Sequence, residues 1–283
     1  GHSPLLKHTQ AQARALEFKL ASESVRVFVA MRYWHPMAAE TVLRVAEFNP
    51  DQIVLLPLYP QFSSSTTASS FQDWDEAAQN VGLDIPVSRI CCFSEDSGFV
   101  ETMVEGTRRA IAKCKSITAP RVLFSAHGLP KKFVAAGDPY QDQVERTAEA
   151  IINELAIDGL DHIVCYQSRV GRLEWLRPYT DDEIRRAGRD RVPVVVVPIA
   201  FVCEHSETLV ELDIDYAALA ELSGVPMYYR VPTAGTDVAF IQSLARLVGL
   251  ALTQANSTLS GRGDRVCPAM FRDCPMISKD ADS

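Results

Sequence analysis

The chain has 283 residues, 47% hydrophobic and 23% charged, so it can bury a large core, and its length predicts two domains of roughly 100–150 residues each. The net charge of −8 argues against nucleic acid or an anionic membrane surface as the main partner, because either favours a basic surface. No apolar run approaches the ~20 residues of a transmembrane helix, and the first residues lack a signal-peptide pattern. Seven cysteines favour reduced thiols or metal ligation over disulfides, and we expect a cytoplasmic protein.

Short strand patterns alternate with longer helical patterns along the whole chain, which is typical of parallel βαβ units. In the first part we predict strands at 25–31, 53–58 and 85–93, and helices at 7–22, 37–48 and 100–114. After a linker-like stretch the pattern restarts, with strands at 122–126, 163–166, 194–197 and 225–229 and helices at 139–155, from Thr180, from Ser206 and at 237–250.

These elements predict a division of the chain near residue 118. We expect a first domain over residues 1–118 and a second over 119–236. The closing helix, 237–252, is expected to pack back on the first domain, and residues 253–283 form a polar tail that contains Cys267 and Cys274.

Three carboxylates follow the all-valine strand at 194–197. Glu207, Glu211 and Asp215 recur at i, i+4 and i+8 on a helix that Ser206 can cap, so they share one helical face. Such a face is equally typical of a solvated surface. His205 beside Glu207 favours a site, because open α/β sheets bind ligands at the carboxyl ends of their strands.

Other chemical groups also follow predicted strands. His127 leaves the 122–126 strand and is either a metal ligand or proton acceptor, or a structural histidine. The hydroxyl run at 63–67 either caps a helix or holds ligand carboxylates, as the planar fork of Arg32 would. Tyr33 and Trp175 on such loops suggest a flat, apolar ligand, although each alone is typical of a core.

Taken in order, these motifs resemble those of the ferrochelatases. They are RYWHP at 32–36, YPQFSSSTT at 59–67, FSAHGLP at 124–130, GDPY at 137–140, YQSRVG at 166–171, Trp175, and the stretch 198–216. The resemblance implies two Rossmann-like domains, each a parallel sheet flanked by helices, facing across a cleft. It implies insertion of Fe²⁺ into protoporphyrin IX to form protohaem. A porphyrin or metal carrier without turnover, and a chelatase for another metal or for coproporphyrin, stay open as alternatives.

The resemblance also implies roles for the charged residues. His127 is expected on one side of the ring as proton acceptor or metal ligand, and Glu207 is expected to face it across the cleft. Glu211 and Asp215 are expected to conduct cations in or protons out. His205 and Glu204 are expected to support that relay.

The porphyrin contacts carried over from the family lie mainly in the first domain. They are Arg32, Tyr33, Tyr59, Ser63, Ser65 and Trp175. Peripheral contact with a membrane is compatible with this resemblance, and no oligomeric state is predicted. The family normally begins with a strand and a Gly-Gly-Pro loop that are not found before Gly1, so we expect the first sheet to lack its N-terminal strand.

The cysteines raise a separate expectation. Some ferrochelatases carry a [2Fe–2S] cluster on C-terminal cysteines together with a cysteine of the first domain, and such a cluster needs four thiolates. Here the candidates are Cys92, Cys267 and Cys274, with Cys91 or Cys114 as the fourth. The alternative is that these are free thiols on a tail, since their spacing differs from the ferredoxin patterns.

Overall fold

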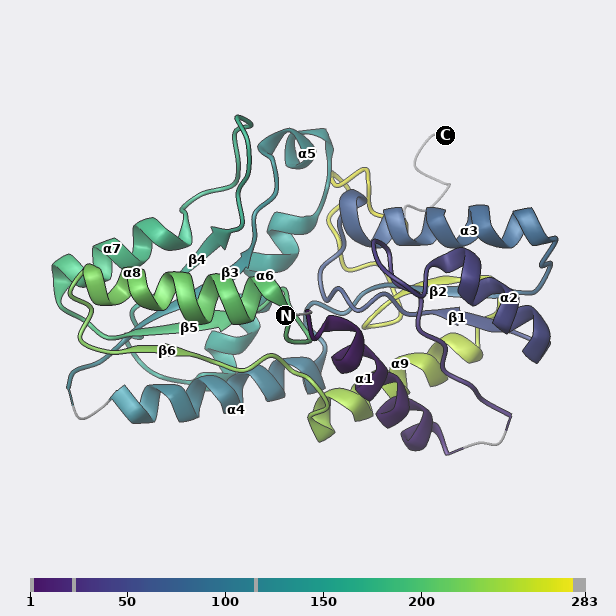
Figure 1. The fold of residues 1–283 in the computed structure, drawn as a ribbon, viewed down its shortest axis with the longest axis horizontal. Helices are drawn as coiled ribbons and strands as arrows, with labels where there is room; N and C mark the ends of the chain where they lie inside the picture. The colour runs from purple at the N-terminus through teal and green to yellow at the C-terminus, as the bar shows by residue number, and fades with distance from the viewer. Residues whose placement is uncertain (1–2, 22–23, 115–116, 277–283) are drawn as a thin grey trace.

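The computed structural model of the protein describes residues 3–21, 24–114 and 117–276, which form two lobes, each built around a parallel β-sheet with helices on both faces (Figure 1). The strand order is β1-β2-β7 in the first sheet and β4-β3-β5-β6 in the second. This confirms the predicted α/β architecture with two parallel sheets. None of the described helices is long and apolar enough to cross a membrane.

The first sheet contains β1 (Ile53–Leu55), β2 (Val87–Cys92) and β7 (Thr258–Ser260). Side chains of α2 (Ala38–Phe48) and α3 (Ser69–Val81) pack on one face with Ile53. The helix α9 (Val238–Leu252) packs against β1 and β2 and also contacts α1 (Leu5–Leu20). Strand β1 ends before Pro57, which has no N–H to offer a ladder.

Two sequence predictions fail in this lobe. The stretch 25–31, predicted as a strand, forms no ladder and makes only an isolated bridge between Met31 and Met37. The stretch after residue 252, predicted as a polar tail, contributes β7 to the sheet beside β2. A segment forms a strand only when it pairs with a neighbouring strand. The local amino-acid composition does not show whether such a neighbour is present.

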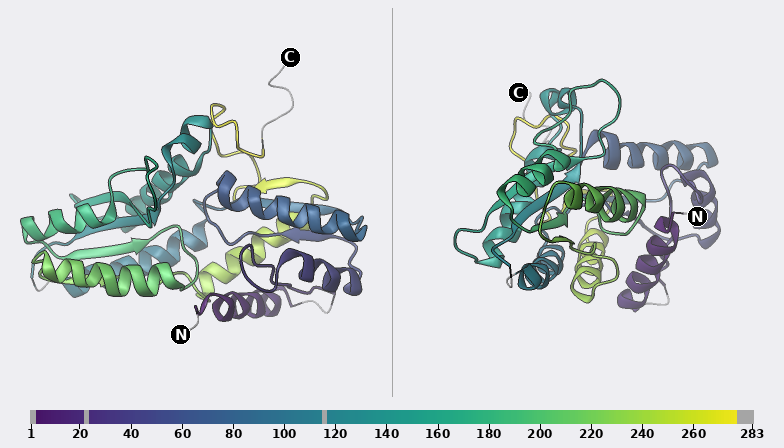
Figure 2. Two further views of the ribbon diagram at one scale, coloured as in Figure 1. Left: turned by 45° about the horizontal axis from the view of Figure 1, so that its top comes forward. Right: turned by 60° about the vertical axis from the view of Figure 1, so that its left-hand side comes forward.

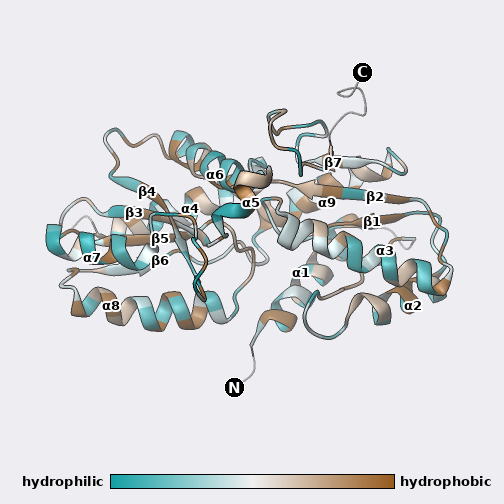
Figure 3. Cartoon of the chain, turned by 90° about the horizontal axis from the view of Figure 1, so that it is seen from above, coloured by the Kyte–Doolittle hydropathy of each residue, from teal (hydrophilic) through white to brown (hydrophobic). Residues whose placement is uncertain are grey.

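The second sheet contains β3 (Arg121–His127), β4 (His162–Gln167), β5 (Val194–Pro198) and β6 (Tyr228–Arg230). Phe124 packs toward α4 (Ser97–Cys114) and α6 (Tyr140–Leu155), whereas Leu123 packs toward α7 (Thr180–Asp190) and α8 (Tyr216–Leu222). Because helices cover both faces, the valines of β5 are fully buried, as the all-apolar run predicts. Figure 3 shows these helices banded in hydrophilic and hydrophobic colours, as amphipathic cover requires.

The acidic helix begins in an unusual way. Residues Glu207–Asp215 form a π-helix, η2, that continues into α8. Ser206 does not cap it, because its backbone is already helical and its side chain makes no capping bond. The imidazole of His205 takes that role and accepts the Glu207 N–H through Nδ1 at 3.1 Å.

The C-terminal segment returns to the junction of the lobes after β7, where Figure 2 shows it as a yellow loop beside α5 (Lys131–Ala136). It is anchored on the second lobe. Asp273 donates its N–H to the carbonyl of Gly137 at 3.2 Å, and Arg146 donates to the carbonyl of Val266 at 2.7 Å. The predicted domain boundaries themselves stay a prediction.

Candidate active site

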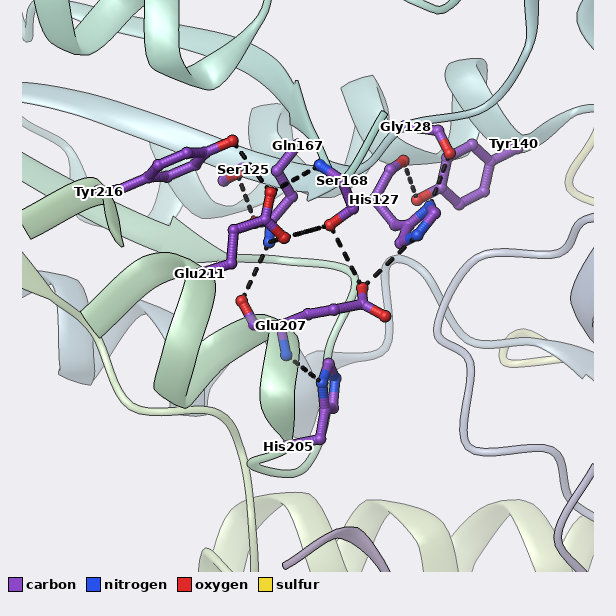
Figure 4. Close-up of polar contacts among 10 residues, drawn as sticks. All are labelled: Ser125, His127, Gly128, Tyr140, Gln167, Ser168, His205, Glu207, Glu211 and Tyr216. Atoms are coloured by element: carbon purple, nitrogen blue, oxygen red, sulfur yellow. Dashed lines mark hydrogen bonds and ion pairs between the residues drawn. The ribbon is translucent and has the colours of Figure 1, made fainter. Parts of the chain in front are cut away.

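His127 lies at the carboxyl end of β3 with a defined orientation (Figure 4). Its Nδ1 is 2.6 Å from the carbonyl oxygen of Gly128. Because a carbonyl only accepts, Nδ1 carries the hydrogen, and in the neutral ring Nε2 keeps a free lone pair. The hydroxyl of Tyr140 donates to the carbonyl of His127 at 2.9 Å and steadies the backbone at this point.

Glu207 is the neighbour of that lone pair. Its Oε2 is 3.6 Å from Nε2 of His127, and both side chains are about 40% exposed (42% and 37%), so a ligand can reach them. The two groups lie side by side on the second lobe, and the expectation that Glu207 faces His127 across the cleft is wrong. The reason is that β3 and η2 both deliver their side chains to the same edge of one sheet. Burial lowers the pKa of His205, which suits its role as an uncharged acceptor for the Glu207 N–H.

The carboxylate of Glu211 accepts hydrogen bonds from four donors. Tyr216 donates its hydroxyl at 3.0 Å and Gln167 its amide at 3.1 Å. Ser168 donates both its N–H, at 2.8 Å, and its hydroxyl. Ser168 has a left-handed backbone, φ 63°, which lets both groups point at one carboxylate. Its hydroxyl is also 3.5 Å from Glu207.

Glu204 does not join this group. Its carboxylate binds Arg230 at 2.8 Å and the N–H of Thr233 at 3.1 Å. Burial raises its pKa, but hydrogen bonds from Thr208 and Arg230 outweigh burial and lower it overall. Glu204 is therefore a fixed structural ion partner, which argues against the predicted part in a relay.

Two cavities meet at the His127–Glu207 pair. The larger, of about 1310 Å³, lies between the lobes, and the smaller, of about 630 Å³, lies over η2. The larger exceeds the ~300–1,000 Å³ of ordinary small-molecule pockets, so it has room for a macrocycle. The predicted residues that line the larger cavity are Arg32, Tyr33, Tyr59, Ser63, Ser65, His127, Trp175, His205 and Glu207. Glu211 and Asp215 line the smaller one, and both cavities share His127, Trp175, Ser206 and Glu207.

The hydroxyl loop, residues 61–65, forms part of the first-lobe wall. The hydroxyl of Ser63 donates to Asp138 at 2.9 Å and is almost fully buried, so it is committed within the protein. Ser65 lies 2.9 Å from Ser63 and keeps more exposure. The π-helix η1 (Ser64–Ala68) begins within this loop, and Arg32 binds Ser69 just beyond η1 at 2.7 Å.

The aromatic wall is carried by Trp175. Its Nε1 donates to the carbonyl of Val170 at 3.1 Å, and the ring lies against Gly128. A Cβ on Gly128 would come within 2.8 Å of the Gln167 carbonyl oxygen and 3.1 Å of the indole, so only glycine allows this approach. On the opposite wall the guanidinium of Arg32 stacks 4.7 Å from the ring centre of Tyr33.

Four buried thiols gather outside this cleft. An irregularity in β2 between Ile90 and Cys92 brings the adjacent Cys91 and Cys92 sulfurs to 3.6 Å from each other. Cys267 and Cys274 form a hydrogen-bonded pair, in which Cys267 lowers the pKa of Cys274. A hydrogen bond with Cys92, burial and the two tail thiols together raise the pKa of Cys91. Val266, the chain neighbour of Cys267, packs against the buried cluster that contains Cys91 and Cys92, so the tail segment reaches the first pair.

The fifth candidate thiol lies elsewhere. Cys114 is packed in the main core at the end of α4 and does not join the pairs, so of the two alternatives Cys91 is the one beside the other thiols. Among the described ranges no three His, Cys, Asp or Glu side chains already surround a common point as a single metal ion requires. The thiols are arranged two and two.

Sequence reasoning missed several residues that organise the site. They are Asp138, Tyr140, Gln167, Ser168 and Tyr216. Four of them lie in the quoted motifs GDPY and YQSRVG, and Tyr216 ends the quoted stretch 198–216, but none of the five received a role from the sequence. The left-handed backbone of Ser168 has no local signature, since it is not a glycine or asparagine.

Comparison with known proteins gives consistent results. The family model described as Ferrochelatase matches residues 1–252. The chain is 48% identical over 279 residues to a ferrochelatase of Caulobacter vibrioides, covering 97% of this chain and 79% of that protein. It is 46% identical over 250 residues to that of Wolbachia pipientis wMel, covering 87% and 78%, and 40% identical over 282 residues to that of Pelagibacter ubique, covering 98% and 81%.

Solved structures show the same fold at low sequence identity. The chain is similar to SirB from Bacillus subtilis with Fe³⁺, with a TM-score of 0.58, 17% identity, and coverage of 87% and 90% of the two chains. It is also similar to the sirohydrochlorin chelatase SirB in complex with cobalt, with a TM-score of 0.57, 16% identity, and coverage of 88% and 91%. At this identity the likeness concerns the fold alone.

Proposed function

This chain belongs to the ferrochelatase family and inserts Fe²⁺ into protoporphyrin in haem biosynthesis, and we propose that His127 and Glu207 carry the chemistry. The observation that carries this assignment is their 3.6 Å pairing where the two cavities meet. One cavity is large enough for the macrocycle, and the other is lined by further carboxylates. The pair therefore stands between the ring and an acidic route.

Metal insertion must remove two pyrrole N–H protons for each Fe²⁺ that enters the ring. The free Nε2 of His127 is the group suited to accept the first proton, because Nδ1 is already committed to Gly128. Glu207, beside it, stabilises the imidazolium that forms and can take the proton onward. The two protons leave, and the dianionic ring that remains balances the charge of Fe²⁺.

The same two groups suit the metal. One imidazole and one carboxylate bind Fe²⁺ while leaving coordination positions open, so the ion can be passed to the ring nitrogens. Glu211 and Asp215 extend the negative charge from Glu207 along the smaller cavity. Because four donors already saturate Glu211, it acts as a fixed anion that attracts cations.

The ring itself is expected to lie in the larger cavity. Trp175 and Tyr33 offer aromatic surfaces at its walls, and Arg32 and Ser65 are the groups suited to propionates. Tyr59 contributes a neutral hydroxyl, since burial raises its pKa. Ser63 supports this wall indirectly through Asp138.

The assignment is tested by His127→Ala and Glu207→Gln, followed by Fe²⁺ insertion into protoporphyrin. We expect each change to lower kcat by about 10²–10⁴, the usual contribution of a general acid or base, while thermal unfolding stays close to that of the wild type. Glu221→Gln, an exposed residue of α8, is the control and should be fully active.

Normal turnover in either variant would contradict the roles of His127 and Glu207. If the wild type binds the ring without converting its spectrum to that of haem, the protein is a carrier. If it prefers another divalent metal or coproporphyrin in a competition assay, it is a chelatase of different specificity.

We also propose that the four thiols hold a [2Fe–2S] cluster. The donor set fits, because such a cluster takes four thiolates, two on each iron, and the thiols form the pairs Cys91–Cys92 and Cys267–Cys274. The lowered pKa of Cys274 favours its thiolate. When bound, the cluster would supply a redox-active iron centre, and no step of the reaction above needs it.

The cluster proposal is tested on anaerobically purified protein from iron-replete cells. We expect visible absorbance with about two irons and two sulfides per chain. Cys91→Ser and Cys274→Ser should each abolish the absorbance and the bound iron and sulfide. Cys114→Ser changes a buried thiol outside the pairs and should keep all three signals. A colourless, sulfide-free wild type would mean that these cysteines are free thiols.

Peripheral contact with a membrane is supported by the rims of the cleft. Tyr33 and Val170 line the two cavities, and Trp34 and Leu173 are near them in the chain. These four side chains expose between 53% and 73% of their surface. We propose that these four side chains touch a bilayer that supplies an apolar porphyrin. The cytoplasmic compartment stays a prediction from the sequence.

A further inference from the structure

The hydroxyl loop of the first lobe is held in place by buried side chains of the second. Gln61 donates its amide to the hydroxyl of Thr147 at 3.0 Å. Asp138 accepts hydrogen bonds from Ser63 and Ser64 at 2.8–2.9 Å. The loop therefore takes its position from groups just before α6 and within its first half.

Gln143 is the third of these holding groups, and it has a second partner. Its Oε1 accepts the N–H of Phe62 at 2.8 Å, and its Nε2 donates to the sulfur of Cys267 at 3.0 Å. The orientation of the amide is fixed, because only Oε1 can accept the backbone N–H. Gln143 is fully buried, so neither end has water as a substitute partner.

One rigid amide thus joins the thiol site to the porphyrin side of the molecule. Cys267 sits in the C-terminal segment, whereas Phe62 precedes Ser63 and Ser65 in the hydroxyl loop. If the sulfur ceases to accept, Nε2 is left buried and unpaired, a costly state that favours rotation of the amide. Rotation would in turn release the N–H of Phe62.

We propose that Gln143 is a positioning residue that couples the chemical state of Cys267 to the affinity of the hydroxyl loop for porphyrin. The proposal rests on the proposed function, since it takes the larger cavity as the porphyrin site. Coupling between two sites is reciprocal, so porphyrin binding must favour the same state of Cys267 that favours porphyrin. The catalytic pair is not involved, because His127 and Glu207 have separate partners.

The test is a mutant cycle read by porphyrin affinity, measured as quenching of protein fluorescence by protoporphyrin without added iron. Cys267→Ala removes the acceptor, and we expect the Kd to rise about fivefold. Cys267→Ser restores an acceptor and should return the Kd to within about twofold of the wild type. Cys114→Ala controls for the loss of any buried thiol and should leave the Kd unchanged.

Gln143→Leu completes the cycle. It should raise the Kd about tenfold, and Cys267→Ala should add nothing further in that background, because the pathway is already broken. In the insertion assay both variants should raise KM for porphyrin and leave kcat within about twofold. A purely structural defect would instead lower kcat as well, and it would lower the thermal stability of the variant.

Several outcomes would overturn the coupling. Additive effects of Cys267→Ala and Gln143→Leu would show that the two residues act independently. Equal losses of porphyrin affinity in Cys267→Ala and Cys267→Ser would assign the effect to metal ligation, because serine does not replace cysteine as a ligand. This comparison does not depend on whether a Gln143 variant folds. If the wild type fails to bind protoporphyrin at all, the proposed function fails instead.

Discussion

Glu207, Glu211 and Asp215 are evenly spaced along η2, but their surroundings give them different tasks. Glu207 pairs with His127 and borders both cavities. Glu211 is saturated by Tyr216, Gln167 and Ser168. Asp215 lines only the smaller cavity, at the far end of the π-helix. The three carboxylates therefore run along the helix from the His127–Glu207 pair into the smaller cavity.

This order predicts graded effects of neutralisation. We expect Glu207→Gln to cost about 10²–10⁴ in kcat, as loss of a general base does, and Asp215→Asn to cost less than about tenfold. Glu211→Gln should also destabilise the fold by about 1–3 kcal/mol. The reason is that some of the hydrogen-bond donors that now bind the carboxylate would then face the NH₂ group of the new amide, which cannot accept. Insertion rates and urea unfolding of the three variants measure this.

Equal losses of kcat from Glu207→Gln and Asp215→Asn would refute the gradient. Asp213 offers a matched control on the same helix, because its carboxylate is already bound to Arg230, away from both cavities. Asp213→Asn should therefore affect unfolding more than turnover.

At this scale the sequence points to the proposed catalytic residues but not to their supports. His127 and Glu207 each follow a strand, which favours a site without excluding a structural role, and the resemblance to the ferrochelatases supplied their expected roles. The same resemblance implied a supporting role for Glu204, yet Glu204 binds Arg230. Arg230 is 26 residues away, and no local pattern reports such a partner.

At the scale of elements, the junction between β3 and β4 depends on close backbone approach. Gly128 follows β3 and lies against the carbonyl of Gln167 at the end of β4 and the ring of Trp175. Its N–H donates to that carbonyl at 2.7 Å. His127, one residue earlier, takes its orientation from the carbonyl of Gly128.

Gly128→Ala should therefore push the chain after β3 away from the end of β4. A Cβ would meet the Gln167 carbonyl at 2.8 Å, so we expect a loss of about 1–3 kcal/mol in unfolding free energy, as overpacking usually costs. Trp175 fluorescence should shift and kcat should fall, because the imidazole of His127 turns. Gly249→Ala is the matched control, since nothing lies within 4 Å of its Cβ position and α9 should gain up to about 1 kcal/mol. Unchanged kcat in Gly128→Ala would contradict the link to His127.

Elements with strong periodicity were predictable, and elements defined by partners were not. The buried valines of β5 and the amphipathic α6 show their type in sequence. The stretch 25–31 has the composition of a strand but forms no ladder. The π-helical winding of η2 also escapes a periodicity argument, because Glu207, Glu211 and Asp215 suit an α-helix equally well.

At the scale of the whole molecule, the lobes are joined by polar contacts as well as by packing. Gln12 of α1 donates to the carbonyls of Val202 and Gly235, and Gln61 donates to that of Ile199. These amides connect first-lobe segments to the chain leaving β5, at Ile199 and Val202, and to the chain leaving β6, at Gly235. Two of the three carbonyls therefore belong to the stretch that leads to Glu207.

The alternation of strands and helices predicts two parallel sheets, and the structure contains them. The return of the chain to the first lobe was predictable only in part. The fifteen-residue α9 shows its helical period, but the three residues of β7 are too few to carry any.

The position of β7 also affects how the protein is made. A ribosome delivers the chain from its N-terminus, and domains generally begin to fold in that order. The second sheet uses one continuous stretch, residues 121–230, and can close as soon as that stretch has emerged. The β2 edge of the first sheet, in contrast, must wait for residues 258–260, which emerge only after the whole of the second sheet. The first lobe therefore begins to form before the second lobe and is completed after it.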